Sequence, residues 1–263
     1  MAVKRRTTGR QAKPTDGGFG RQRSVDLLWG SRERPSRGPK PGLNLDAVVD
    51  AAIHVVQAEG LAALTMARIA EELKVTTMAL YRYVPGKDEL IDLMIDAALG
   101  TPPAPTGQDW RTEVGQWVRA DLAVFRRHPW LLQTTIIRVP IGPNWLAWLE
   151  SLLRALSGTG LKANEQISVA FLVDGHARSA AEIALGVTST PQWAADFGRV
   201  LGTVIGDNRF SALAGVATAG GFEKAGENEH FEFGLQRLLD GIDAFIQTRV
   251  PQRRTRTARR SRV

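Results

Sequence analysis

Apolar residues return every three or four positions through most of the chain between residues 45 and 248. This spacing is that of one face of an α-helix. The pattern begins with Leu45, Val48, Val49, Ala52, Ile53 and Val56, and Glu59-Gly60 ends this first predicted helix, with Gly60 as its left-handed cap residue. It predicts further helices from about Asp88 and at about 109–128, 143–157, 163–186, 192–204 and 231–248. Since no persuasive strand pattern occurs, the predicted fold class is all-α.

Residues 65–87 are predicted to form two short helices separated by a tight turn, which is the pattern of a helix-turn-helix. Thr65 can cap the first helix, and Thr76 can cap the second. The apolar stripe of the first helix is Met66, Ile69, Ala70 and Leu73, whereas only Leu80 and Val84 look inward from the second. The opposite face carries Thr77, Met78, Tyr81, Arg82 and Tyr83, with no carboxylate between Val75 and Lys87. Such a face can lie against phosphates and base edges.

A segment rich in Pro and Gly, residues 100–107, interrupts the helical pattern and is the best candidate for a domain boundary. The sequence therefore predicts a helix-turn-helix domain over residues 43–100 and a larger helical domain over residues 108–248. Residues 1–42 are expected to be a mostly disordered basic arm in which Leu27-Leu28-Trp29 can dock, and residues 249–263 a disordered basic tail. The glycines of residues 207–229 indicate a long loop.

The net charge of +7 is unevenly distributed. Residues 1–42 hold eleven Lys/Arg and three Asp/Glu, residues 249–263 hold seven Lys/Arg and no acid, and the part between them has a net charge of −8. A uniformly basic nucleic-acid surface is thus excluded. The basic ends are either solubilising tails or arms that add phosphate contacts, and the second interpretation leaves nonspecific nucleic-acid binding through the tails as an alternative function.

The residue types needed for most site chemistry are absent or badly spaced. Without cysteine there is no disulfide, thiolate metal site or Cys nucleophile, which fits a cytoplasmic protein. The four histidines form neither HExxH nor an i, i+4 pair, so no metal or other cofactor is expected. Neither a nucleophile elbow nor a phosphate-binding loop occurs, which argues against an enzyme. No apolar run approaches the roughly 20 residues that span a bilayer, and the first thirty residues lack a signal-peptide core.

Six of the seven tryptophans follow the Pro/Gly-rich segment. Core packing explains most of them, but some can line a pocket for a flat apolar or cationic molecule. The candidate effector contacts are Met94, Trp117, Trp145, Trp148, Phe171 and His176. Helix 163–186 also has many small residues, which favour close helix packing, either in a four-helix dimer interface with the last helix or inside a monomer core.

Residues 45–99 resemble the N-terminal DNA-binding domain of the tetracycline-repressor (TetR) family of transcriptional regulators. The matching residues are Ala58-Glu59-Gly60, Thr65-x-x-x-Ile69-Ala70 and Val75-x-x-x-x-Leu80-Tyr81-x-Tyr83-Val84-x-x-Lys87-x-x-Leu90. The second half is similar to the C-terminal domain of the tetracycline-repressor branch through His128-Pro129-Trp130, Gly142-Pro143-Asn144 and Phe231-Glu232-Phe233-Gly234-Leu235-x-x-Leu238-Leu239-Asp240-Gly241. Leu27-Leu28-Trp29-Gly30 is similar to an element that precedes the domain in some such regulators.

The resemblance implies a homodimer that binds a palindromic double-stranded DNA operator, most often as a repressor in this family, and is released by a small apolar or aromatic effector. It implies a DNA-contacting set of Thr65, Thr76, Thr77, Met78, Ala79, Tyr81, Arg82, Tyr83 and Lys87, in which Thr65 and Lys87 contact phosphate. Lys74 stands where the family usually has the turn glycine. If the turn requires a positive φ there, lysine costs about 1 kcal/mol.

Overall fold

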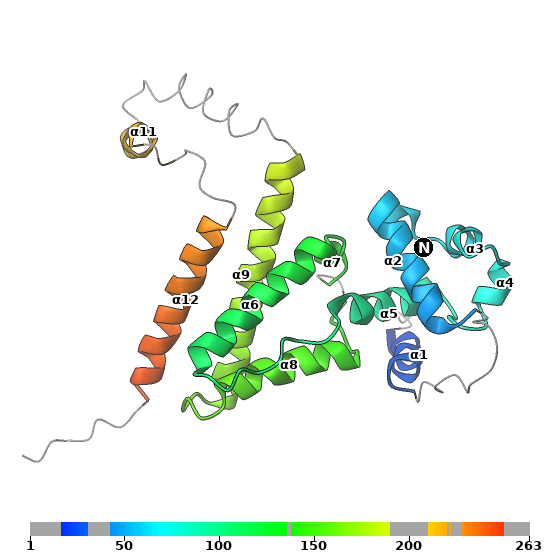
Figure 1. The fold of residues 1–263 in the computed structure, drawn as a ribbon, viewed down its shortest axis with the longest axis horizontal. Helices are drawn as coiled ribbons and strands as arrows, with labels where there is room; N and C mark the ends of the chain where they lie inside the picture. Colours follow the sequence, from blue (N-terminus) through cyan, green and yellow to red (C-terminus); the bar gives the residue numbers. More distant parts are fainter. Residues whose placement is uncertain are drawn as a thin grey trace, which may run out of the picture. The chain divides into compact units, whose positions relative to one another are not determined.

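The computed structural model describes residues 17–30, 43–135, 138–189, 210–219, 221 and 228–249 (Figure 1). Within these ranges every regular element is a helix, which confirms the all-α prediction. The chain divides into two compact units, residues 1–94 and residues 95–263. The division lies inside one helix, α5 (Lys87–Leu99), rather than in the Pro/Gly-rich segment. Over the described residues, no helix is long and apolar enough to cross a membrane.

The first unit is a small helical core around α2 (Leu45–Glu59), the 3-10 turn η1 (Leu61–Ala63), α3 (Met66–Glu72), α4 (Thr77–Leu80) and the start of α5. The side chain of Asn44 caps α2 by accepting a hydrogen bond from the Ala47 backbone N–H at 2.7 Å. Gly60 ends the helix with φ at 85°. The core side chains are Val48, Val49, Ala52, Val55, Val56, Leu64, Ile69, Leu80, Val84 and Leu90.

A further helix, α1 (Gly17–Trp29), lies within the arm that the sequence predicted to be mostly disordered, so that prediction is wrong for this stretch. Leu28 is buried, whereas Trp29 is 50% exposed. Ser24 is also buried and donates a hydrogen bond of 2.5 Å to the Asp92 carboxylate on α5. Tertiary contacts stabilise this weakly amphipathic helix, and such contacts leave little trace in local composition. Residues 1–16 and 31–42 lie outside the described ranges.

The second unit is built on four long helices, α6 (Trp110–Arg127), α8 (Pro143–Leu156), α9 (Ala163–Ser189) and α12 (Glu229–Gln247), with the short α7 (Leu131–Thr134). Helix α9 packs against the other three long helices. The core side chains include Val114, Val118, Leu122, Phe125, Leu152, Leu156, Val173, Ala177, Leu235 and Leu239.

The start of α8 is held by a carboxylate from α5. Asp96 is 3% exposed and accepts hydrogen bonds from the backbone N–H groups of Asn144 at 2.9 Å and Trp145 at 3.2 Å. The Asn144 side chain donates in turn to the Asp96 carbonyl at 2.9 Å. A carboxylate at this position satisfies free N–H groups and complements the helix dipole. Asp96 therefore caps α8 from a distant point in the sequence.

The predicted long loop over residues 207–229 contains a helix, α11 (Ser211–Thr218), so the loop prediction is wrong there. The interior glycine, Gly215, costs such a helix only about 1 kcal/mol relative to alanine, and the neighbouring alanines are good helix formers. The helix predicted at 192–204 lies outside the described residues. The other predicted helices of this unit agree with α6, α8, α9 and α12 to within a few residues at each end.

Candidate functional site

The two threonines of the helix-turn-helix cap its helices as predicted. The Thr65 hydroxyl oxygen accepts from the Arg68 backbone N–H at 3.1 Å, and that of Thr76 accepts from the Ala79 N–H at 3.3 Å. Both threonines remain exposed. Each hydroxyl hydrogen can therefore still be donated to another acceptor, such as a phosphate oxygen.

The segment from Thr76 to Lys87 presents one polar and aromatic face to solvent. Its two inward side chains, Leu80 and Val84, are fully buried and fix the segment on the first unit. The exposed candidates are Thr65, Thr76, Thr77, Met78, Tyr81, Arg82 and Lys87, and the half-buried ones are Ala79 and Tyr83. Met78 is 76% exposed and Tyr81 is 48% exposed, although large apolar and aromatic side chains are usually more buried. The structure thus gathers all nine candidates around one short helix.

Lys74 occupies the turn between the two helices with a φ of 56°, and it is the one residue other than glycine with a positive φ among the described residues. Helix α3 ends at Leu73, after which the Lys74 N–H donates to the Glu71 carbonyl at 3.0 Å and the Val75 N–H to the Ala70 carbonyl at 2.9 Å. This is the hydrogen bonding of a helix end closed by a left-handed residue. The turn therefore does require a positive φ at this lysine, as the sequence suggested.

Replacing Lys74 with glycine is expected to stabilise the protein by about 1 kcal/mol, because glycine adopts a positive φ without the steric cost. Lys74→Ala is the matched control, since alanine also removes the charge but retains the strain. Urea denaturation of the three proteins provides the measurement. Equal stability of the glycine and alanine variants would show that the turn is not strained.

The tryptophans nominated for an effector site are largely engaged in packing. Trp117 and Trp148 meet edge to face with ring centroids 5.3 Å apart. The indole N–H of Trp117 donates to the Trp148 carbonyl at 2.9 Å, and that of Trp148 donates to the Gly100 carbonyl at 3.0 Å. Buried indoles normally find such partners. The pair therefore fastens α6, α8 and the segment after α5 together.

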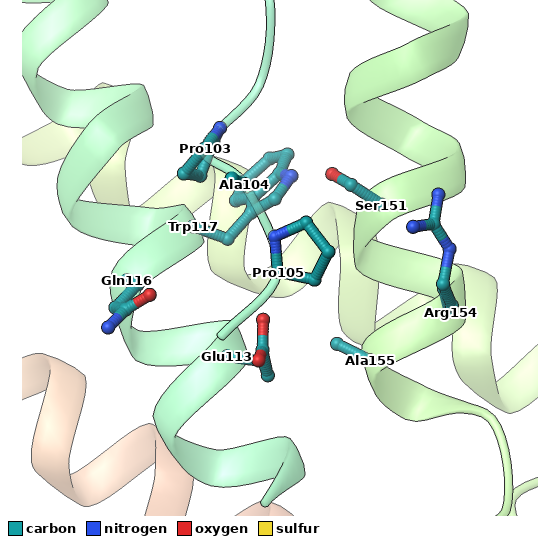
Figure 2. Close-up of a pocket in the computed structure, with 9 residues that line it drawn as sticks. All are labelled: Pro103, Ala104, Pro105, Glu113, Gln116, Trp117, Ser151, Arg154 and Ala155. Atoms are coloured by element: carbon teal, nitrogen blue, oxygen red, sulfur yellow. The ribbon is translucent and has the colours of Figure 1, made fainter. Parts of the chain in front are cut away.

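A small pocket lies beside this pair, between α6, α8 and the segment before α6 (Figure 2). Its lining comprises Pro103, Ala104, Pro105, Glu113, Gln116, Trp117, Ser151, Arg154 and Ala155. The free volume is about 20 Å³, which is room for a single water molecule rather than for an effector.

The other nominated effector contacts lie apart from this pair. Met94 is fully buried on α5, and Phe171 is 71% exposed on α9. The His176 ring stacks on Phe231 of α12 at 5.0 Å, with its Nε2 2.9 Å from the Phe231 carbonyl oxygen. Trp145 is half-buried at the start of α8. The described residues contain no cluster of three or more His, Asp or Glu able to hold a metal ion.

A buried pair of carboxyl groups was missed by sequence reasoning. Asp121 on α6 is 3% exposed, and its Oδ2 has no hydrogen-bond partner among the described residues. Burial and the neighbouring Asp174 of α9 raise the pKa of Asp121 well above its usual range, and burial also raises the pKa of Asp174. The nearby guanidinium of Arg178 opposes both shifts. Asp121 lies at i+4 from Trp117 on the apolar face of its helix, which was the available signal.

The Asp121 carboxyl should make stability depend on pH. A pKa raised by folding gives stability that is complete below about pH 4 and is lost as the pH rises through the folded-state pKa. Asp121→Asn should therefore be more stable than the native protein at pH 8, by about 1 kcal/mol or more, and its stability should change less with pH. Denaturant titrations at pH 4, 6 and 8 test this, with the exposed Asp50→Asn as charge-matched control. Parallel pH profiles for the native protein and Asp121→Asn would contradict the assignment.

Comparison with known proteins places both halves of the chain in one family. Residues 48–94 match the family model of bacterial regulatory proteins of the tetR family, and residues 102–246 match that of the tetracyclin repressor-like C-terminal domain. The HTH-type transcriptional repressor DrrR1 of Streptomyces coeruleorubidus is 39% identical over 256 residues, which cover 92% of this chain and 93% of the relative.

Solved structures agree with these matches. Apo ActR from Streptomyces coelicolor superposes with a TM-score of 0.70 at 29% identity, covering 80% of this chain and 99% of that one. ActR in complex with actinorhodin gives a TM-score of 0.67 at the same identity, covering 78% and 99%. The capped helix-turn-helix and the helical second unit thus have counterparts across nearly the whole chain, which belongs to the TetR family of ligand-responsive, DNA-binding transcriptional regulators.

Proposed function

We propose that the protein is a homodimeric repressor that binds a palindromic operator and leaves it when a small effector binds the second unit. The observation that carries this proposal is the exposed, carboxylate-free face of residues 76–87, held by Leu80 and Val84 on an otherwise acidic unit. With one such face in each subunit, the operator half-sites would lie roughly 34–36 Å apart in successive major grooves.

The recognition segment, residues 76–87, reads the operator, while the helix termini beside it fix its position. Thr77, Met78, Ala79, Tyr81 and Tyr83 face the bases, and Arg82 lies at the edge of this face. Thr65, Thr76 and Lys87 contact phosphates, because hydroxyl and ammonium groups at helix starts are common phosphate partners. Met78 and Tyr81 support this assignment, since exposed apolar and aromatic side chains are suited to the methyl groups and edges of bases.

The homodimer forms through α9 and α12, which pack side by side in each subunit. Exposed residues follow one stripe of α9 at four-residue spacing, namely Ile167, Phe171, Gly175, Ser179 and Ile183. A second exposed stripe, on α12, contains Phe233, Arg237, Gly241 and Phe245. Ile183 and Phe233 are 63% and 66% exposed, and adjacent apolar stripes of this kind favour a self-complementary interface of four helices.

The small residues of α9 serve the subunit itself as well. Ala170, Ala177 and Ala181 are buried within the subunit, where they allow close packing. The alternative of a tightly packed core therefore applies to these alanines. The larger exposed side chains are the ones assigned to the subunit interface.

The effector is a small apolar or aromatic molecule that binds within residues 95–249. The tryptophans of this unit favour a ligand of this type, since indole rings stack on flat apolar molecules. The complex of ActR with actinorhodin supports an effector site in a chain of this fold. Ligand binding weakens the DNA complex if it favours a dimer whose two recognition segments no longer match the groove spacing. Helix α5 supplies the covalent link, since it carries residues of both units.

A mobility-shift assay tests the function directly. The full chain should bind a fragment from upstream of its own gene far more tightly than a random fragment of equal length at physiological salt. Equal binding of the two fragments would instead favour nonspecific attachment through the basic tails. Screening small aromatic compounds by tryptophan fluorescence, followed by release of the bound fragment, would identify the effector.

A further inference from the structure

The folded DNA-binding unit is itself acidic. Residues 43–94 contain four Lys/Arg and eight Asp/Glu, a net charge of −4. One of the four cations, Arg68, forms ion pairs with Glu59 at 2.7 Å and Glu72 at 2.9 Å. This leaves Lys74, Arg82 and Lys87 as the cations without an ion pair in the described part of this unit. Three cations are few for binding a polyanion, because neutralised phosphates supply most of the nonspecific binding energy.

The missing positive charge lies immediately before α1 in the sequence. Residues 1–16 hold Lys4, Arg5, Arg6, Arg10 and Lys13 against the single acid Asp16, a net charge of +4. This basic segment alone offsets the net charge of residues 43–94. Its composition, with little to bury, is suited to contact with phosphates rather than to a core.

Helix α1 fastens this basic segment to the DNA-binding unit. Ser24 is fully buried and donates to the Asp92 carboxylate at 2.5 Å, and Leu28, one turn further along α1, is buried as well. Both ends of this hydrogen bond lie in the same compact unit. A buried hydroxyl paired with a carboxylate is a specific contact, since separation would leave the charged group unsatisfied.

The anchor lies close to the expected phosphate contacts. Asp92 and Lys87 are five residues apart on α5, which corresponds to about 8 Å along a helix axis. A chain of 16 residues reaches up to about 50 Å when extended. Since α1 holds the end of the basic segment near the recognition segment, the basic segment stays at high local concentration near DNA bound there.

We propose that residues 1–16 bind the phosphate backbone of operator DNA and that α1 is the anchor that presents them. This inference rests on the proposed function, because it adds a second DNA-binding site to the same unit. The basic segment supplies affinity without reading sequence, while residues 76–87 supply the discrimination between sequences.

The salt dependence of binding tests the basic segment. In the full chain, Lys4, Arg5, Arg6, Arg10 and Lys13 are all replaced by glutamine, and binding to the upstream fragment is measured from 50 to 200 mM salt. We expect the slope of log K against log salt to become less steep by about 0.9 for each phosphate that is no longer neutralised, with two or more phosphates affected. The matched control replaces five arginines of the other tail, Arg253, Arg254, Arg256, Arg259 and Arg260.

The anchor has a separate test. Ser24→Ala removes the hydrogen bond to Asp92 but keeps every charge of the segment. We expect operator affinity to fall several-fold with the salt slope unchanged, because the same phosphate contacts form from a less ordered segment. A native affinity for Ser24→Ala would overturn the anchoring role. Circular dichroism of the variant reports whether the fold is retained.

The outcomes separate this proposal from the proposed function. If the native protein prefers the upstream fragment but the five-glutamine variant shows the native slope and affinity, the phosphate contacts of residues 1–16 do not exist. An equal reduction of slope in the tail control would also overturn the proposal, since any added charge would then suffice. If the native protein itself fails to prefer the upstream fragment, the proposed operator binding is wrong.

Discussion

Replacing both Phe171 and Ile183 with glutamate is expected to produce a folded monomer and to weaken operator binding about 100-fold or more. The two side chains are 71% and 63% exposed in the single subunit, so their replacement should leave its core intact. In the proposed dimer they would be buried, and an unpaired carboxylate in an apolar interface is strongly unfavourable. Without the dimer the second recognition segment is absent, and its linked binding typically adds a factor of about 100 to 10,000.

Sedimentation equilibrium and the mobility-shift assay provide the two measurements for this variant. The matched control replaces Val139 and Leu146 with glutamate, because both are exposed apolar residues outside the α9 and α12 stripes. The control should remain dimeric and bind the operator normally. A dimeric Phe171/Ile183 variant would refute the assignment of α9 to the interface.

Truncating Tyr81 or Lys87 to alanine is expected to lower operator affinity by about 1–3 kcal/mol, or roughly 5-fold to 150-fold, while the dimer persists. Tyr81 is 48% exposed and Lys87 is exposed, so neither truncation removes core packing. The two variants should differ in kind. Lys87→Ala should reduce the slope of log K against log salt by about 1, whereas Tyr81→Ala should relax discrimination between operator sequences.

Fluorescence anisotropy with a labelled upstream fragment over a range of salt concentrations measures both effects. His54→Ala is a suitable control, because His54 is exposed on α2 outside the recognition segment. Native affinity in both the Tyr81 and Lys87 variants would show that another face of the first unit contacts DNA.

The helix-turn-helix could be predicted from sequence because its determinants are local. The threonine caps act within three residues, and the positions of Leu80 and Val84 follow from helical periodicity. The positive φ of Lys74 was also foreseeable, since the turn length between two helices dictates the backbone conformation there. In each case the physical cause lies within one or two turns of chain.

The failures share the opposite property. Helix α1 depends on Asp92, which is 68 residues from its partner Ser24, and the carboxyl pair depends on Asp121 and Asp174 meeting across two helices. Aromatic composition correctly indicated a packed second unit, but it could not tell a packed indole from one that faces a ligand. Trp117 and Trp148 illustrate this limit, because both use their N–H groups on backbone carbonyls.

The cap that Asp96 provides for α8 restricts how hybrid regulators can be assembled from this protein. Exchanging the second unit for that of a relative would, from sequence, be attempted at the flexible-looking residues 100–107. That joint would separate Asp96 from the Asn144 and Trp145 N–H groups it satisfies. It would also separate Asp96 from Gly142, where any larger residue would overlap the carboxylate. A workable joint therefore falls after Met94, so that the last turn of α5 is transplanted together with the domain it caps.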